Sequence, residues 1–204
     1  ANLFLWDETT ETWTELSRWI TTYHREGRYL VDATPALVHL AEGGTRRIKY
    51  SFAPSWNVQP TWTHLDFRFR DAGVGHQPTA STYLYSGGGF NSAYNDDREP
   101  VEVPIPATAA RVELWSIITG HGMDTGNCAE FCNITHDFVV NGHSVTLESP
   151  EAGSPQDCMN KVSEGTVPNQ YGTWWYGRNG WCPGKEVQMV TIDVSDSVAY
   201  SQGI

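Results

Sequence analysis

The sequence has few basic residues, and they are scattered along the chain. Lys and Arg number 13 against 24 Asp and Glu, which gives a formal charge of −11 at pH 7. Proteins that bind nucleic acid or anionic lipid present clustered basic side chains. We therefore expect no nucleic-acid partner and no membrane partner.

Long apolar runs and helical periodicity are also lacking. No segment reaches the run of about 18 apolar residues that marks a transmembrane helix. No signal peptide stands at the start, so we expect a mature chain. Helical spacing is nearly confined to residues 34–44, "TPALVHLAEGG", where Thr34 is a candidate cap and Pro35 the first helical residue.

Cysteine is scarce, and its spacing argues against zinc. The chain has Cys128, Cys132, Cys158 and Cys182, with no Cys-x-x-Cys pair. An even number favours disulfides and a secreted protein, extracellular or periplasmic. Four cysteines allow three pairings, of which nearest neighbours are the simplest. We expect no metal and no cofactor.

Turn residues are plentiful, and they separate short alternating runs. The chain has 19 Gly and 11 Pro, with 9 Trp, 9 Tyr and 7 Phe available for a core. We expect a hairpin in residues 1–16 that turns at Asp7 to Thr10, and strands in 46–56, 63–71, 80–90, 101–106, 110–120, 136–147 and 187–195. This pattern predicts an all-β sandwich or jelly roll. A cluster of Gly, Pro and small polar residues at 71–81 predicts two domains, 1–71 and 72–204.

The stretch "NCAEFCNITH", residues 127–136, places one glutamate between two cysteines. Residues four apart on a strand lie about 13 Å from each other. A disulfide needs Cα atoms within about 7 Å, so a Cys128–Cys132 pair would hold Glu130 on a tight turn. A fixed carboxylate suits acid–base chemistry or orientation of an amide; the alternative is a surface glutamate on a stapled turn. Asn133 begins an N-glycosylation sequon.

A second stretch, "WWYGRNGWCPG" at residues 174–184, combines three tryptophans with an arginine. Aromatic faces can stack on sugar rings or fill a core, so Trp175 and Trp181 are candidates for either role. Arg178 offers a planar fork of hydrogen-bond donors.

Taken together, these stretches resemble the peptide:N-glycosidase F family. "CAEFC" followed by "TH" and a strand, with "GRNGWCPG" at the last cysteine, carries the resemblance. "ANLFLWDETTETWTELSRWITTYHR" is similar to a hairpin and strand of the family's first domain, and "IITGHG" to the strand end before the cysteine loop. The resemblance implies two adjacent antiparallel eight-stranded jelly-roll β-sandwiches. It also implies cleavage of the amide bond between Asn and the first N-acetylglucosamine of N-linked glycans, on glycoproteins or glycopeptides.

Residue by residue, the resemblance implies a site at the interface of the two domains. Glu130 matches a catalytic glutamate that acts through a water or positions the scissile amide, and Arg178 matches an active-site arginine. The implied substrate-binding residues are Trp56, Trp175, Trp181 and His121. The implied disulfides are Cys128–Cys132 and Cys158–Cys182.

Several departures from the family shape the expectation. Pro54 stands where the family has a second active-site glutamate, and His121 where it has a tryptophan. The family's main aspartate precedes the segment that Ala1-Asn2-Leu3 resembles, and further strands follow its C-terminal match. We therefore expect that peptides cleaved from the same precursor complete the sheet edges and supply the aspartate.

Two other functions remain open from the sequence. The chain could be a glycan-binding or catalytically inactive relative, which the Pro54 and His121 departures favour. A copper-dependent monooxygenase of the peptidylglycine type has similar jelly rolls but would need a His/Met cluster. His121, Met123, His136 and His143 are available for one, although no His-x-His pair exists.

Overall fold

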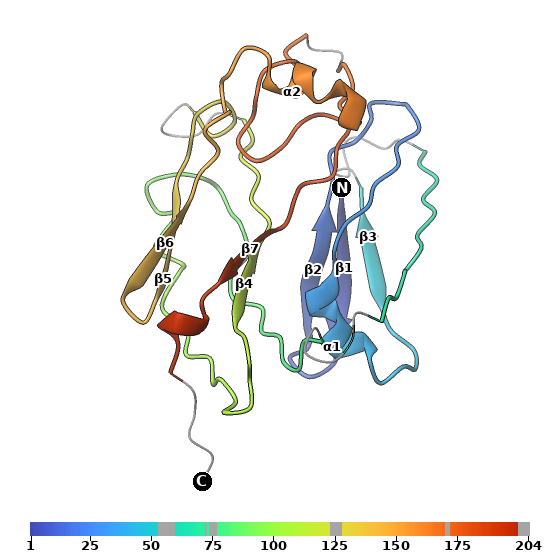
Figure 1. Cartoon of the computed structure of the whole chain (residues 1–204). Helices are drawn as coiled ribbons and strands as arrows, with labels where there is room; N and C mark the ends of the chain where they lie inside the picture. Colours follow the sequence, from blue (N-terminus) through green and yellow to red (C-terminus); the bar gives the residue numbers. More distant parts are fainter. Residues whose placement is uncertain (53–59, 72, 74–76, 123–127, 170–171, 200–204) are drawn as a thin grey trace. The chain divides into compact units, whose positions relative to one another are not determined.

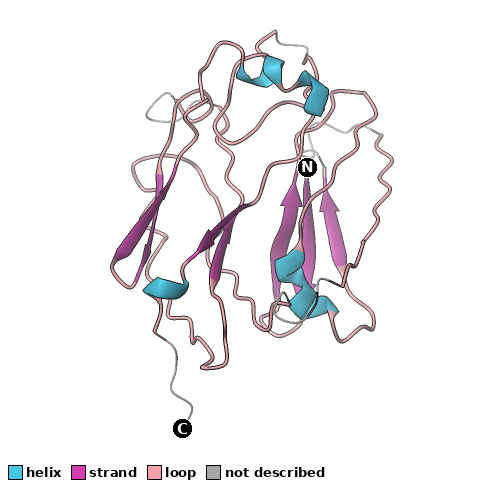
Figure 2. Cartoon of the chain, viewed as in Figure 1, coloured by secondary structure: helices cyan, strands magenta, loops and turns pink. Residues whose placement is uncertain are grey.

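The computed structural model describes residues 1–52, 60–71, 73, 77–122, 128–169 and 172–199. Within these residues strands outnumber helices, and every helix is a single short turn of three or four residues (Figure 2). The predicted all-β class is confirmed. The eight-stranded jelly-roll arrangement stays a prediction. Within the same residues, none of the helices has the length and apolar content needed to cross a membrane.

The chain divides into two compact units. The first consists of Ala1–Arg18 and Ala33–Ser81, and the second of Trp19–Asp32 and Thr82–Ile204. Each unit is held together by its own contacts, so each is described by itself. The domain boundary near residue 72 stays a prediction.

The first unit is built on a three-stranded antiparallel sheet of order β2-β1-β3 (Figure 1). The strands are β1 (Asn2–Asp7), β2 (Thr12–Arg18) and β3 (Ile48–Ser51). The expected hairpin is present, with Trp6 opposite Trp13 and Asp7 opposite Thr12. Alternation along β1 explains its two faces, since Leu3 and Leu5 are 5% and 1% exposed.

The opposite face of β1 is covered by basic side chains on aromatic rings. Lys49 Nζ lies 4.5 Å from the ring centre of Phe4, and Arg47 Cζ lies 4.5 Å from that of Trp6. These cation–π contacts let large aromatic residues occupy the partly exposed face of a small sheet.

The predicted helix forms only in part. A 3₁₀ turn, η1 (Thr34–Ala36), leads directly into one α-helical turn, α1 (Leu37–Leu40). The prediction that Thr34 caps the helix is wrong, because Ala33 occupies the N-cap position without a side-chain hydrogen bond. Pro35 lies in the first turn as expected, since its fixed φ suits that place.

Three expected strands lack a ladder partner among the described residues. Segments 63–71, 80–90 and 101–106 carry no strand. In the first of them and just before it, large apolar side chains are exposed: Trp62 by 99%, Leu65 by 42%, Phe67 by 39% and Phe69 by 68%. Alternation favours an extended backbone, but a strand also needs a neighbour whose N–H and C=O groups complete the ladder.

The second unit holds two antiparallel pairs (Figure 1). Strand β4 (Glu113–Ser116) pairs with β7 (Val190–Asp193), and β5 (His136–Val140) pairs with β6 (His143–Leu147). Asn141 and Gly142 join β5 to β6, and both have the positive φ (48° and 85°) that a two-residue type I′ turn requires. The short helices are α2 (Asp157–Asn160), η2 (Val162–Glu164) and η3 (Ser195–Ser197).

The second disulfide belongs to the buried part of the second unit. Cys158 and Cys182 are joined, with Cα atoms 5.5 Å apart, and are 0% and 5% exposed. Val187 is buried as well, at 2% exposure. The disulfide ties α2 to the segment that follows Arg178, and so fixes the position of the site described next.

Candidate active site

The cysteine loop is closed and fastened to the segment that carries Arg178. Cys128 and Cys132 form a disulfide with Cα atoms 5.2 Å apart. The backbone carbonyl of Glu130 accepts from the N–H of Asn179 at 2.8 Å, and the Asn179 side-chain amide donates to the Ala129 carbonyl at 3.3 Å. The loop therefore has a fixed place relative to residues 178–181.

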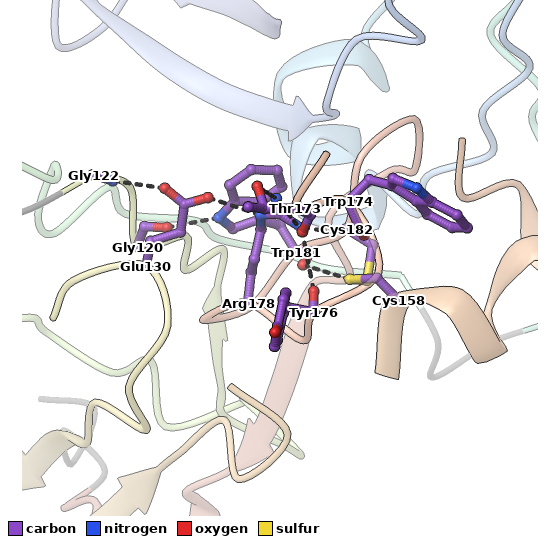
Figure 3. Close-up of polar contacts among 10 residues, drawn as sticks. All are labelled: Gly120, Gly122, Glu130, Cys158, Thr173, Trp174, Tyr176, Arg178, Trp181 and Cys182. Carbon is purple, nitrogen blue, oxygen red and sulfur yellow. Dashed lines mark hydrogen bonds and ion pairs between the residues drawn. A yellow bond between two sulfur atoms is a disulfide. The ribbon is translucent and has the colours of Figure 1, made fainter. Parts of the chain in front are cut away.

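From the residues that the structure describes, the Glu130 carboxylate accepts one hydrogen bond on each oxygen (Figure 3). Arg178 Nε donates to Oε1 at 2.7 Å, and the backbone N–H of Gly122 donates to Oε2 at 3.0 Å. The Glu130 side chain remains 19% exposed. A carboxylate oxygen has two lone pairs, so each oxygen can accept one more hydrogen bond from an incoming group.

The Arg178 guanidinium is buried and fully engaged. Besides the Glu130 bond, Nη1 donates to the carbonyls of Trp174 (3.3 Å) and Tyr176 (3.2 Å), and Nη2 to the carbonyl (2.9 Å) and hydroxyl (3.3 Å) of Thr173 (Figure 3). These bonds match the five N–H donors of the group. The Arg178 side chain is 1% exposed, so its guanidinium has almost no contact with solvent.

Two aromatic rings enclose the guanidinium. Arg178 Cζ lies 4.7 Å from the ring centre of Trp181 and 5.1 Å from that of Phe131. The Trp181 indole N–H donates to the Gly120 carbonyl at 2.6 Å, and the His121 ring lies 4.8 Å from the Trp181 ring at an angle of 35°. Trp181 is thus engaged by residues of this chain at both its N–H and its ring.

Close backbone approach at this site requires glycine. A Cβ on Gly120 would overlap the Ala129 carbonyl oxygen. A Cβ on Gly180 would overlap the Ile118 carbonyl oxygen, and φ at Gly180 is +79°. The glycines of "IITGHG" and "GRNGW" therefore let the strand end, the cysteine loop and the arginine segment meet.

The predicted site residues are only partly brought together. The structure joins Glu130 to Arg178 and places the His121 ring beside that of Trp181 in a tilted contact. Trp175 instead lies within an aromatic run, with ring centres 6.1 Å from Trp174 and 5.8 Å from Tyr176. Trp56 and Pro54 lie outside the described residues. The substrate-binding roles stay predictions.

Sequence reasoning missed the groups that hold the pair in place. These are the Gly122 N–H on the carboxylate and the Thr173 carbonyl and hydroxyl on the guanidinium. Backbone partners leave no residue-type signature. The one signal was the density of glycine around the two stretches, which indicates close backbone contact.

The sequon asparagine is exposed and already engaged. The Asn133 Nδ2 atom donates to Glu148 Oε2 at 3.0 Å, and its Oδ1 accepts from the Ser149 N–H at 2.7 Å. A glycan would be attached at Nδ2, so glycosylation would compete with the Glu148 contact. Glycosylation of Asn133 stays a prediction.

One cluster of potential metal-ligand types occurs within the described ranges. It consists of Asp157, Cys158 and Cys182. Both sulfurs are used in the disulfide, so this cluster lacks the thiolates that a metal would require. Of the residues considered for copper, Met123 lies outside the described ranges.

Comparison with known proteins gives one family and a set of similar structures. Residues 89–204 match the family model described as "Peptide-N-glycosidase F, C terminal". A search of curated proteins found no match.

The similar structures all carry one activity in their titles. A peptide-N(4)-(N-acetyl-β-D-glucosaminyl)asparagine amidase matches 98% of this chain and 67% of its own, at 20% identity and a TM-score of 0.57. PNGase F, a glycosylasparaginase from Flavobacterium meningosepticum, gives the same coverage and TM-score at 19% identity. The match to a recombinant peptide:N-glycanase F covers 94% of this chain and 64% of that protein, at 20% identity and a TM-score of 0.55. The chain thus spans about two thirds of their length, and at this identity the likeness establishes the fold.

Proposed function

This chain belongs to the peptide-N-glycosidase F family, and on that premise we propose that it hydrolyses the amide bond between Asn and the first N-acetylglucosamine of N-linked glycans. Its substrates would be glycoproteins or glycopeptides. The observation that carries the proposal is the Glu130 carboxylate, held by Arg178 and Gly122 yet still reachable from solvent.

Amide hydrolysis places three demands on a site. A water must be activated, the charge that develops on the carbonyl oxygen must be stabilised, and the leaving nitrogen must receive a proton. The Glu130 lone pairs that no described residue occupies fit the first demand, since they can accept from a water; they can also orient the substrate by accepting from its amide N–H. Rigid support on both oxygens keeps the carboxylate in one orientation.

Arg178 would serve as a positioning residue. Its donors end on Glu130 and on carbonyls of its own segment, and its side chain is 1% exposed. Its bond to Oε1 holds the Glu130 carboxylate in one orientation. A direct contact with the sugar would require one of these bonds to break.

Companion peptides from the same precursor form part of the proposal. The exposed apolar side chains of residues 62–69 support it, because an added segment would cover them and pair with the backbone. One such peptide would supply the aspartate that activates water. The two disulfides support a secreted protein, extracellular or periplasmic.

The test is conversion of a defined N-glycopeptide in heavy-oxygen water. The sample is the protein as isolated, with any bound peptides retained. We expect glycosylated Asn to become Asp with heavy oxygen incorporated. Glu130→Gln, which keeps the shape, should lower the rate about 10²–10³-fold. Glu102→Gln, a change at an exposed glutamate, is the matched control. Equal rates for the two variants would exclude a catalytic role for Glu130.

One observation favours a second function, glycan binding without turnover. Because every Arg178 donor is engaged within the chain, this residue offers no donor to a developing oxyanion. Tight glycopeptide binding with no conversion, in a sample shown to contain its companion peptides, would favour this function over the amidase.

A further inference from the structure

The second unit has a surface hollow that lies outside the Glu130 site. Its volume is about 370 Å³, within the roughly 300–1,000 Å³ of typical ligand pockets. It is formed by one stretch, residues 84–98, that turns back on itself. Its lining combines a tyrosine pair, a run of three glycines and one charge of each sign: Tyr85, Tyr94, Gly87, Gly88, Gly89, Asp97 and Arg98.

Arg98 holds the two arms of the stretch together. Its Cζ atom lies 3.6 Å from the Tyr94 ring centre, and its guanidinium donates to the carbonyls of Tyr94 and, at 3.1 Å, Ser86. Backbone turns add to this, since the Tyr94 N–H donates to the Asn91 carbonyl at 3.0 Å. The two sides of the hollow are therefore held together by hydrogen bonds and a cation–π contact.

The Tyr85 hydroxyl is held by a hydrogen bond, and the residue is partly exposed. Its hydroxyl donates to the Glu99 carbonyl at 2.8 Å, whereas no aromatic ring of the described residues packs against it. The residue is 39% exposed. A ring held by its hydroxyl offers a fixed apolar face at low entropic cost.

Polar groups beside this ring are unused. The Asp97 carboxylate has no hydrogen bond or ion pair with any residue that the structure describes. The N–H groups of Gly87, Gly88 and Gly89 likewise donate to no acceptor within those ranges. Unused donors and acceptors next to a partly exposed ring are the elements with which pockets orient a polar ligand.

We propose that this hollow binds a neutral sugar unit of the glycan substrate. The ring face of Tyr85 would cover the apolar face of the sugar, Asp97 would accept from its hydroxyls, and the Gly87–Gly89 amides would donate to its oxygens. The charges of Asp97 and Arg98 balance, which favours a neutral sugar over an acidic one. The proposal rests on the amidase function, because a glycan held at Glu130 brings further sugar units to this surface.

The hollow lies within reach of a glycan bound at Glu130. The Tyr94 ring contacts that of His136, with centres 6.4 Å apart. His136 follows Glu130 by six residues, and six extended residues span at most about 20 Å. An oligosaccharide of several units can extend over this distance.

The first experiment measures binding alone. Mannotriose and N,N′-diacetylchitobiose are titrated separately into the intact protein, and amide shifts are followed by NMR. We expect shifts at Gly87, Gly88 and Gly89 for at least one of them, and Tyr85→Ala should raise Kd about tenfold. Tyr83→Ala is the matched control, because Tyr83 is 43% exposed and does not line the hollow. An absence of shifts at the glycines, or equal losses in the two variants, would overturn the proposal, as would tighter binding of sialyllactose.

The second experiment separates this proposal from the amidase function. A branched N-glycopeptide and one that carries a single N-acetylglucosamine are compared as substrates. Tyr85→Ala should raise KM for the branched substrate about tenfold and leave the short one unchanged. An equal effect on both would overturn the sugar subsite. If neither is hydrolysed by the wild-type protein, the amidase fails, and the titration still decides whether the hollow binds sugar.

Discussion

Arg178 and Glu130 form an ion pair in which only the carboxylate faces solvent. The two side chains are joined by a 2.7 Å bond from Nε to Oε1, and they are 1% and 19% exposed. The guanidinium uses its remaining donors on backbone carbonyls and the Thr173 hydroxyl. The two side chains therefore differ in role: Arg178 holds the carboxylate in place, and Glu130 remains accessible to a ligand.

Arg178→Lys should be damaging even though it keeps the charge. An ammonium has three donors on a flexible stem and cannot reproduce the planar fork. Because several buried carbonyls and one carboxylate would lose partners, we expect the free energy of unfolding to fall by about 3 kcal/mol. Urea unfolding measures this.

The control for this change is Arg111→Lys. The Arg111 side chain is 59% exposed and pairs with Glu113 and Asp193. Loss of an exposed pair should cost less than about 1 kcal/mol. Similar losses in the two variants would show that the Arg178 network is not the source of the effect.

The two disulfides should differ in accessibility and in role. Cys128 and Cys132 are partly exposed, whereas Cys158 and Cys182 are buried. We expect mild reductant to open the first disulfide before the second. The first closes a loop of sequence separation 4 and the second a loop of separation 24. Because each disulfide lowers the conformational entropy of the unfolded chain, they should stabilise the fold by about 2 and about 3.5 kcal/mol respectively.

Two paired substitutions test this difference. Cys128→Ser with Cys132→Ser should lower glycopeptide conversion more than it lowers stability, because Glu130 loses its fixed turn. Cys158→Ser with Cys182→Ser should mainly lower stability. Thermal unfolding and conversion rates are measured on both, and the reverse ranking would contradict the assignment.

Gly120→Ala should disturb the site without changing any charged group. The added Cβ would overlap the Ala129 carbonyl oxygen, and backbone atoms cannot move aside cheaply. We expect a loss of about 1–3 kcal/mol in the free energy of unfolding, the usual cost of overpacking. Gly87→Ala is the matched control for stability, since a Cβ there meets nothing within 4 Å. A neutral Gly120→Ala would mean that the strand end and the cysteine loop can separate freely.

His136 should make the protein less stable in mild acid. Burial lowers the pKa of His136 below its ordinary 6.5, and Arg98 lowers it further, while Asp137 opposes both. The fold thus favours neutral imidazole. Its contribution to stability is complete above the unfolded pKa of about 6.5 and is lost as the pH falls through the lower folded pKa.

NMR titration of the His136 ring measures this directly. We expect a midpoint below 6.5, and Arg98→Gln should move it upward because one repulsive charge is removed. His136→Phe should reduce the decline in unfolding free energy between about pH 7 and pH 5. A midpoint unaffected by Arg98→Gln would show that Arg98 does not contribute to the pKa.

Local features were readable from the sequence because each depends on residues close together in the chain. Alternation predicted the β1–β2 hairpin. The expectation of one strand over residues 136–147 was wrong, because the chain turns at Asn141-Gly142 and forms β5 and β6 instead. Spacing favoured the pairing of Cys128 with Cys132, which forces the turn that presents Glu130. The sequence by itself therefore determined the all-β class and the carboxylate of the candidate site.

The tertiary structure decided which strands pair and which groups bond to the Glu130 and Arg178 side chains. Residues 63–71 alternate as a strand would, yet they lack a ladder neighbour in the described ranges. Glu130 and Arg178 lie 48 positions apart, and the bonds that fix them come mainly from backbone groups, which every residue type possesses. Such contacts depend on how the chain packs rather than on which side chains it carries, so no local pattern could specify them.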